Sequence, residues 1–588
     1  MKIRREILWS LLLMLISAPL FGETWYIRQD GGTRSRAGFP GQCDGKADVP
    51  YHGTGVNQHC AFNDFRLLYN DKSYNGIAGG WAIAGGDTVI IRGCHNADKS
   101  TDCRIGSDPP GVADTWCVGN AIVACSSGPI PSGTATHHTR ILGQNYASCS
   151  KGSVTTRSQL TRLFGGNGLG TAINLGGARY VDFECIDLSD HSQCVQHGSP
   201  AYPNACTNGK DDFTKDGMAT NNTTANVLLQ DVWIHGFSES GISGPIGGLI
   251  TLTRVDVSFN GFAGWNFDDG RSTPDAPGSA INASYVSMIG NGCNEEYPIV
   301  DAFPARSCYD LESGGFGDSW SGQNTTLASF TCDHCIQAYN TKDGFIGPHT
   351  LIAKLTITNS ESYGNMGQQW KWGATTSSST IFENNFTVGN CRRMSAALPG
   401  APSNYNQHLS LYCRADGDIF SFFSSANSTV LFANNTTIGY SATMFDLACA
   451  TKNTCSSTPF IFRNNIMLGF LNQKYHPGDV QPPALYYFTD PSDKVTADHN
   501  VYYNLRDRCL LTGNICSDPL FVGEPARTMR SESDLDNFNF HPSSGSPAVG
   551  HGIAVSGLFT DYYGVARPNS LSIGAAEPSM DQGAGKKK

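Results

Sequence analysis

The chain has 588 residues, of which 39% are hydrophobic and 15% are charged, and its formal net charge is −11 at pH 7. This acidic balance argues against a nucleic-acid partner, because surfaces that bind nucleic acids are rich in Lys and Arg. The 66 glycines, together with many Asn, Ser and Thr residues, favour turns and strands over helices.

Residues 1–22 have the pattern of a secretory signal peptide. Lys2, Arg4 and Arg5 precede an apolar run over 7–21 that is too short to span a bilayer. Its removal leaves 37 basic and 50 acidic residues, so the formal charge moves from −11 to −13. No other long apolar stretch free of charges follows. We therefore expect a secreted protein, periplasmic in a two-membrane bacterium, with no membrane attachment after cleavage.

Twenty cysteines, none of them in residues 1–22, form an even set that is typical of an oxidising compartment. We predict disulfides, with the pairing left open by the spacing. Pairs that are close in sequence are candidates for local bridges: Cys43 and Cys60, Cys94 and Cys103, Cys117 and Cys125, Cys449 and Cys455, Cys509 and Cys516. The Cys332-Asp-His-Cys335 run is a less favoured zinc candidate, because it has no second knuckle and residues three apart on a strand face opposite sides.

The first and last segments of the mature chain resemble the ends of bacterial β-helix proteins, at 24–28 with 85–92 and at 545–575. The expected organisation is a single domain with two caps, and we expect a monomer. Its parts are a signal peptide over 1–22, an N-terminal cap and first coils with disulfide-rich loops over 23–150, a helix core over 151–505, a C-terminal cap over 506–579 and a disordered tail over 580–588.

Internal repeats decide the fold class. β-rich segments that end in Asn recur at 255–260, 285–291, 331–340, 357–365 and 381–390, and the last three Asn are 25 residues apart. A repeat of this length without helical periodicity predicts an all-β, right-handed parallel β-helix, in which equivalent residues of successive coils stack. Leucine-rich repeats have a similar period, but their leucine spacing is absent. We expect the Asn column to form an internal hydrogen-bonded ladder.

The most informative motif lies between Tyr339 and Gly373. It contains Asp343-Gly-Phe and, downstream, Lys371 within Trp-Lys-Trp-Gly, while Asp318 precedes Asp343 by 25 residues, or one coil. These residues resemble the family-nine polysaccharide lyases, secreted β-helix enzymes that cleave pectate-like chains. The resemblance implies that the substrate is an acidic, uronate-containing polysaccharide cleaved by β-elimination, that Lys371 is the base, and that Asp318 and Asp343 are calcium ligands.

This chain departs from the family at two positions. Lys342 and Ile346 replace two further aspartates of the family's calcium site. Calcium takes six to eight oxygen ligands, so any calcium here would depend on water, carbonyl groups and substrate for the rest. As our own hypothesis, the ammonium group of Lys342 takes the place of the cation and neutralises the substrate carboxylate.

The chemistry of elimination suggests the remaining candidate residues. Removal of the proton at C5 of a uronate requires a base beside a positive charge that neutralises the adjacent carboxylate. Trp370 and Trp372 flank Lys371 and are candidates to stack on sugar faces. His349 is a further candidate in the substrate site, as a second base.

Two other functions remain open. A glycoside hydrolase needs paired carboxylates, and these candidates are available for it: Asp211, Asp212 and Asp216 with His235, or the pair Asp268 and Asp269. A non-catalytic polysaccharide-binding or surface protein would use the long flat faces of the same fold. In that case Asp318 and Asp343 are turn residues that cap backbone amides.

Overall fold

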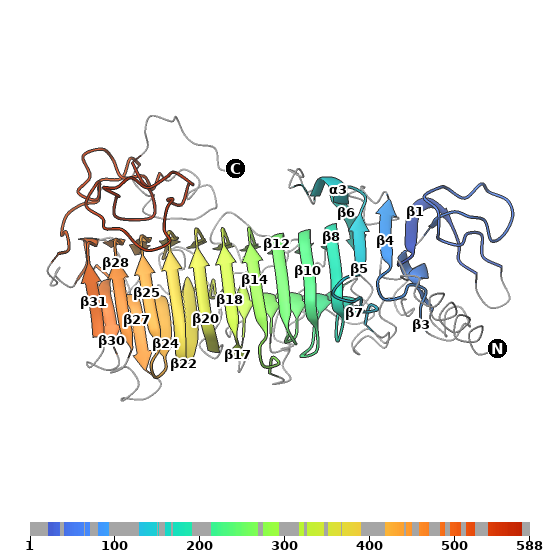
Figure 1. The fold of residues 1–588 in the computed structure, drawn as a ribbon, viewed down its shortest axis with the longest axis horizontal. Helices are drawn as coiled ribbons and strands as arrows, with labels where there is room; N and C mark the ends of the chain where they lie inside the picture. Colours follow the sequence, from blue (N-terminus) through green and yellow to red (C-terminus); the bar gives the residue numbers. More distant parts are fainter. Residues whose placement is uncertain are drawn as a thin grey trace, which may run out of the picture.

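The computed structural model is an elongated stack of short strands, shown from the side in Figure 1. It describes residues 22–35, 40–63, 65–70, 80–92, 129–149, 151, 159–165, 169–190, 213–267, 274–292, 317–322, 326–340, 342–345, 351–365, 367–389, 418–439, 443–449, 458–469, 482–488, 494–506, 513–523 and 539–578. The predicted signal peptide, apart from Gly22, and the predicted tail lie outside these residues. No helix in the described part is long and apolar enough to cross a membrane.

Each coil contributes up to three strands, which stack into three faces that we call A, B and C. Face A contains β1 (Thr24–Gly32), β4 (Thr88–Arg92), β5 (Thr139–Gly143), β8 (Arg179–Ser189), β10 (Ala225–His235), β12 (Leu249–Ser258), β14 (Ala280–Ser284), β17 (Thr326–Leu327), β18 (Ser329–Asp333), β20 (Leu351–Thr358), β25 (Thr429–Ala433), β28 (Pro459–Arg463) and β31 (Lys494–Asp498). The last residues of β8, β10 and β12 continue onto face B.

Faces B and C complete the coils. Face B contains β6 (Thr161–Phe164), β15 (Ser287–Ile289), β19 (Ile336–Ala338), β21 (Glu361–Tyr363), β23 (Phe386–Val388), β26 (Thr436–Gly439), β29 (Ile466–Gly469) and β32 (Val501–Tyr503). Face C contains β7 (Leu169–Asn174), β9 (Thr214–Ala219), β11 (Ser240–Ser243), β13 (Ala263–Asn266), β16 (Trp320–Ser321), β24 (Asp418–Ser424), β27 (Thr443–Cys449) and β30 (Ala484–Phe488). The long strand β22 (Trp370–Glu383) starts on face C and, after Ser377, ends on face A.

Strands of successive coils pair in parallel and in register. Ile250 of β12 pairs with Ile281 of β14, which pairs with Phe330 of β18, which in turn pairs with Leu355 of β20. The other elements are small: the antiparallel pair β2 (Tyr69–Asn70) and β3 (Gly80–Trp81), the 3-10 helix Phe65–Leu68 and the helix α3 (Tyr146–Cys149). The chain is therefore a parallel β-helix, and the predicted all-β fold class is confirmed.

The corner between faces A and B is a single residue in the left-handed conformation on almost every coil. These residues have φ between 49° and 64°: Cys185, Asp231, Arg254, Tyr285, His334, Asn359, Asn384, Asn434, Asn464 and His499. Single residues in this region turn the chain sharply, and Asn tolerates it best among residues with a side chain. The corner thus has constant geometry from coil to coil.

Two internal ladders of Asn side chains follow residues in the left-handed conformation, the first at the end of face B and the second at the corner between faces A and B. One contains Asn260, Asn291, Asn340 and Asn365, and the other contains Asn385, Asn435, Asn465, Asn500 and Asn514. In the first ladder, Asn291 Nδ2 donates to Asn340 Oδ1 at 3.1 Å and Asn340 Nδ2 donates to Asn365 Oδ1 at 2.8 Å. The predicted ladder is confirmed at Asn340 and Asn365, while Asn390 lies outside the described residues.

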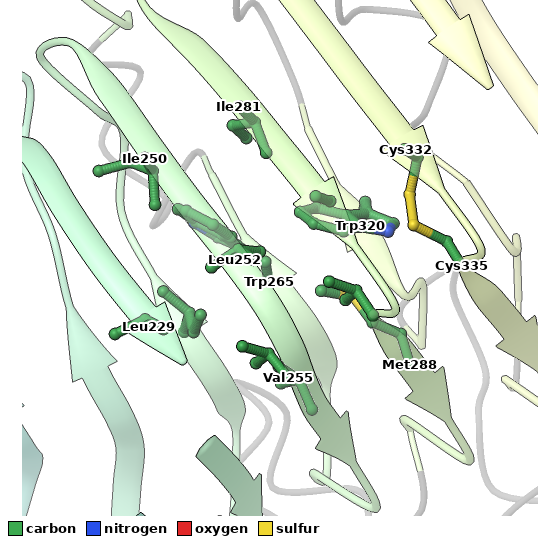
Figure 2. Packing of buried hydrophobic residues seen from close by; sticks show 14 of the residues in the cluster. Leu229, Ile250, Leu252, Val255, Trp265, Ile281, Met288, Trp320, Cys332 and Cys335 are labelled. Atoms are coloured by element: carbon green, nitrogen blue, oxygen red, sulfur yellow. A yellow bond between two sulfur atoms is a disulfide. The ribbon is translucent and has the colours of Figure 1, made fainter. Parts of the chain in front are cut away.

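The interior between the faces is filled by stacked apolar side chains. On face C, Trp265 stacks on Trp320 with ring centroids 5.8 Å apart, and Phe345 and Trp370 continue the column at 5.8 Å. Figure 2 shows Trp265 and Trp320 pointing toward Leu252 and Ile281 of face A. Each fully buried side chain of this size contributes roughly 1.5–3 kcal/mol to folding.

Three disulfides join pairs of described residues. Cys43 and Cys60 are bonded as predicted, whereas the bond between Cys149 of α3 and Cys185 of β8 was not predicted. Each of the other four predicted pairs includes a residue outside the described part. Cys332 and Cys335 are also bonded to one another, so the zinc alternative is wrong. The left-handed residue His334 turns the chain between them, and both sulfurs point into the core, as Figure 2 shows.

The C-terminal segment does more than close the end of the helix. Residues 513–515 add one ladder step, with Ile515 bridging to Val501. Residues 539–578 then fold back along the corner between faces A and B, visible above the last coils in Figure 1. Asn384 Nδ2 donates to the carbonyl oxygen of Thr560 at 2.8 Å. The C-terminal segment therefore packs against the Asn residues of this corner, Asn384, Asn434 and Asn464.

One buried carboxyl beside β14 makes stability depend on pH. Burial raises the pKa of Asp275 to about 6, against the opposing effect of the Ile246 N–H that donates to its Oδ1. Because the folded pKa exceeds the unfolded one, ionisation disfavours the folded state, and the cost grows as pH rises from about 4 to about 7. We expect Asp275→Asn to raise the free energy of unfolding by roughly 2–3 kcal/mol at pH 7 and to have little effect near pH 4.

Denaturant titrations of both chains at several pH values test this expectation. Asp498→Asn is the matched control with the opposite sign, because the hydrogen bond from Arg463 lowers the pKa of Asp498. Its removal should therefore lower stability at pH 7 and have less effect in acid. A gain for Asp275→Asn that does not change with pH would contradict the burial argument.

Candidate functional site

Asp318, Asp343 and Gln368 stack in one column, at the positions that precede the strands of face C. The backbone N–H of Asp343 donates to Asp318 Oδ1 at 3.0 Å, and the N–H of Gln368 donates to Asp343 Oδ1 at 2.8 Å. Both carboxylates are buried, with exposures of 2% and 0%. The stacking predicted from the 25-residue spacing is confirmed, and one oxygen of each carboxylate caps the backbone of the next coil.

The second oxygen of each carboxylate faces a lysine. Lys342 Nζ lies 3.3 Å from Asp318 Oδ2, and Lys371 Nζ lies 3.4 Å from Asp343 Oδ2. The lysine side chains are 25% and 15% exposed. We call Asp318, Lys342, Asp343 and Lys371 the lysine–aspartate cluster. It presents two partly exposed ammonium groups that are anchored by buried carboxylates.

The charges of the cluster act on one another. Burial raises the pKa of Asp318, the ammonium group of Lys342 opposes the shift, and the carboxylate of Asp343 reinforces it. Lys371 also acts on Asp318 across the coil, in the same direction as Lys342. The four groups therefore form one electrostatic unit rather than two isolated ion pairs.

Two glycines allow the coils to approach at the cluster. A Cβ on Gly367 would lie 2.2 Å from Asp343 Oδ1, and a Cβ on Gly344 would lie 2.5 Å from the carbonyl oxygen of Gln369. Both distances are below any normal contact. Any larger residue at either position would push apart the backbone that positions Asp343.

On β22, the side chain of Lys371 points to the opposite side of the strand from those of its two neighbours. Successive side chains on a strand alternate between its two faces, so Lys371 points outward while Trp370 and Trp372 point inward. Trp370 and Trp372 are 0% and 1% exposed, and Trp370 Nε1 donates to Thr387 Oγ1 at 2.9 Å. Our expectation that they stack on sugar faces is wrong, because both belong to the core.

The described residues do not fit the calcium site that the resemblance implies. Three of the four carboxylate oxygens of Asp318 and Asp343 accept a hydrogen bond from a backbone N–H or from Lys342, and the fourth, Asp343 Oδ2, faces the ammonium group of Lys371 at 3.4 Å without a hydrogen bond. Over the residues that the structure describes, no group of three or more His, Cys, Asp or Glu side chains is placed to hold a metal ion. His349 and Ile346 lie outside those residues.

Where the structure describes them, the residues that were candidates for a hydrolase site make structural contacts. His235 Nε2 lies 2.7 Å from Asp187 Oδ1, with both side chains almost fully buried, and the ring of Trp233 stacks on the His235 ring. Asp216 Oδ1 accepts the backbone N–H of Ser240 at 3.2 Å. These buried contacts do not support an acid–base pair that faces a substrate. Asp211, Asp212, Asp268 and Asp269 lie outside the described residues.

Sequence reasoning missed one member of the site. Gln368 contacts both Asp343 and Lys371, since its side-chain Oε1 accepts from Lys371 Nζ at 3.4 Å. The signal that could have found it is its position 25 residues after Asp343, one further step of the same column.

Comparisons with known proteins show a distant likeness to solved structures. No protein-family model matches the chain, and no curated protein matches it. Among solved structures it is similar to the crystal structure of pectate lyase Pel9A, with 12% identity and a TM-score of 0.32, over 87% of this chain and 94% of that one. A likeness at this level gives no information about activity, so the functional conclusion depends on the site itself.

Proposed function

We propose that the chain is a secreted polysaccharide lyase-like enzyme that cleaves an acidic, uronate-containing polymer by β-elimination, with Lys371 as the base. The observation that supports it is the lysine–aspartate cluster, which holds two lysines on adjacent coils at the outer surface of the helix. Anchored ammonium groups are what an anionic polymer needs on a chain whose formal net charge is −11.

In the proposed reaction, Lys371 first gives up its ammonium proton to solvent, and the resulting amine takes the proton from C5 of the uronate. The electron pair of that C–H bond forms the C4=C5 double bond as the C4–O bond breaks, and the leaving oxygen takes up a proton from water. Negative charge develops on the substrate carboxylate as the proton leaves. Lys342 is the group that neutralises this charge, in the position that a metal ion would otherwise occupy.

The two aspartates have a supporting role in this proposal. A lysine on a free surface samples many rotamers, and fixing it costs entropy. Asp318 and Asp343 are themselves fixed by backbone N–H groups, so they hold the lysine tips at defined points. Preorganised charges of this kind stabilise a transition state without reorganisation during the reaction.

The test is to incubate the mature protein with pectate, alginate and glycosaminoglycan-type polymers and to follow the ultraviolet absorbance of unsaturated uronate products. Because Lys342 replaces the metal, a chelator should change the rate by less than about twofold, and Lys342→Ala should lower it by about 10²–10³-fold. Lys354→Ala, at an exposed lysine of β20, is the control and should leave the rate unchanged. Loss of activity on chelation would contradict the role of Lys342.

A non-catalytic polysaccharide-binding protein is the second candidate. It is favoured by one observation: three of the four carboxylate oxygens of the cluster accept hydrogen bonds within the fold, which gives both aspartates a structural role. Retention of a polymer by the wild-type chain without unsaturated products or new reducing ends would identify this function. New reducing ends without ultraviolet absorbance would instead indicate hydrolysis.

A further inference from the structure

The turn between faces B and C on the coil of the site has its own network of side-chain hydrogen bonds. Asn365, the last described member of the first Asn ladder, donates through Nδ2 to Gln369 Oε1 at 2.8 Å. Gln369 Nε2 donates back to the carbonyl oxygens of Asn365, at 3.0 Å, and Gly367, at 3.2 Å. These hydrogen bonds therefore join Asn365, Gly367 and Gln369 to one another and connect them to the core ladder.

The same turn contacts both halves of the lysine–aspartate cluster. The N–H of Gly367 donates to the carbonyl oxygen of Lys342 at 2.7 Å. The N–H of Gln368 donates to Asp343 Oδ1 at 2.8 Å, and Gln368 Oε1 accepts from Lys371 Nζ at 3.4 Å. Gln368 is 5% exposed, so its amide has little freedom to turn away.

These contacts form a triangle. Gln368 holds Asp343 through its backbone, Asp343 faces Lys371 at 3.4 Å, and Gln368 reaches Lys371 through its side chain. The carboxylate of Asp343 attracts the Lys371 tip and the amide oxygen of Gln368 accepts a hydrogen bond from it, so the two groups together restrict its direction more than the carboxylate alone would. The outward side chain of Lys371 then has one preferred position above face C.

We propose that Gln368 is a positioning residue that fixes the Nζ atom of Lys371, and that the hydrogen bonds among Asn365, Gly367 and Gln369 fix Gln368. The consequence for catalysis rests on the proposed function, whereas the positioning itself does not. If the chain is a lyase, the amide keeps the amine aimed at the C5 proton. If it is a binding protein, the same contact fixes one of its two anion-binding ammonium groups.

Competitive acetylation of the folded protein, read out peptide by peptide by mass spectrometry, measures how freely each lysine reacts and needs no enzymatic activity. In Gln368→Leu the side-chain acceptor is lost but the backbone N–H to Asp343 remains. We expect the labelling rate of Lys371 to rise roughly three- to tenfold, the effect of losing one hydrogen bond. Lys354 serves as the internal standard and should not change.

Gln368→Glu keeps an acceptor oxygen at the end of a side chain of the same length. The labelling rate of Lys371 in this variant should equal the wild-type rate or lie below it. Gln368→Asn withdraws the amide by one methylene group and should give an intermediate rate, which is informative if the leucine variant fails to fold. Equal labelling of Lys371 in the wild type and in folded Gln368→Leu or Gln368→Asn would overturn the proposal.

Activity separates this inference from the proposed function. In an active lyase, Gln368→Leu should lower kcat with KM little changed, and should shift the pH profile of kcat, because the amine is misplaced while the polymer still binds. A wild-type chain without lyase activity in which Gln368→Leu still exposes Lys371 would refute the proposed function and support the positioning role.

Discussion

Lys371→Arg is expected to remove the elimination activity while the protein remains folded. The guanidinium group keeps the positive charge that faces Asp343 Oδ2 in the ion pair, but it does not deprotonate in proteins and so cannot take the proton from C5. General-base catalysis of this kind contributes about 10²–10⁴-fold to the rate. The rate of ultraviolet product formation should fall by that factor, and the melting temperature should stay close to the wild-type value.

A second pair of variants controls for the buried carboxylate. Lys371→Met leaves Asp343, which is 0% exposed, without its cation, and so should be destabilised as well as inactive. The double variant Lys371→Met/Asp343→Asn should recover much of the stability and none of the activity. Activity in folded Lys371→Arg within tenfold of the wild type would exclude Lys371 as the base.

Arg567→Met is expected to have the largest effect on stability. Arg567 and Glu577 form an ion pair of 2.7 Å with side chains only 2% and 6% exposed. Arg567 also donates to Asn384 Oδ1 at 2.7 Å and to the carbonyl oxygen of Gly574 at 3.0 Å, so it connects the C-terminal segment to the helix. Loss of one partner of a buried ion pair typically costs about 3–5 kcal/mol.

The expected result is an early unfolding transition in denaturant, accompanied by proteolytic cleavage within 539–578. Glu577→Gln removes the charge but keeps acceptor and donor atoms near Ser572, so the double variant Arg567→Met/Glu577→Gln should be more stable than Arg567→Met alone. A loss below about 1 kcal/mol in Arg567→Met would show that the segment docks without this ion pair.

The sequence was sufficient for the repeat architecture because the coil length is constant where the repeats are most visible. Asn340 and Asn365 are one coil apart, and they hydrogen-bond as expected. The second ladder was missed because its successive members are separated by 50, 30, 35 and 14 residues, with no fixed period. A pattern was nevertheless present, since Asn385, Asn435 and Asn465 each follow another Asn.

The site was predicted in part for a similar reason. The column of Asp318 and Asp343 follows from the coil length alone. One further step of 25 residues would have extended the prediction to Gln368. The direction of Trp370 and Trp372 depends on strand parity, where a shift of one residue exchanges inside and outside. Because side chains alternate along a strand, a base at Lys371 that faces the substrate requires Trp370 and Trp372 to point into the core.

The two ladders also show where this protein tolerates change in length. Along the first ladder, one hydrogen-bonded step spans 25 residues between Asn340 and Asn365 but 49 between Asn291 and Asn340. The additional residues fall in the sequence between Gly292, after face B, and Gly317, before face C, and the strand pairs β14–β18 and β15–β19 on either side of them stay in register. New segments can therefore be inserted at such a turn without changing the stacked strands. Residues that recognise a ligand and residues that stabilise the fold can thus be changed separately in this chain.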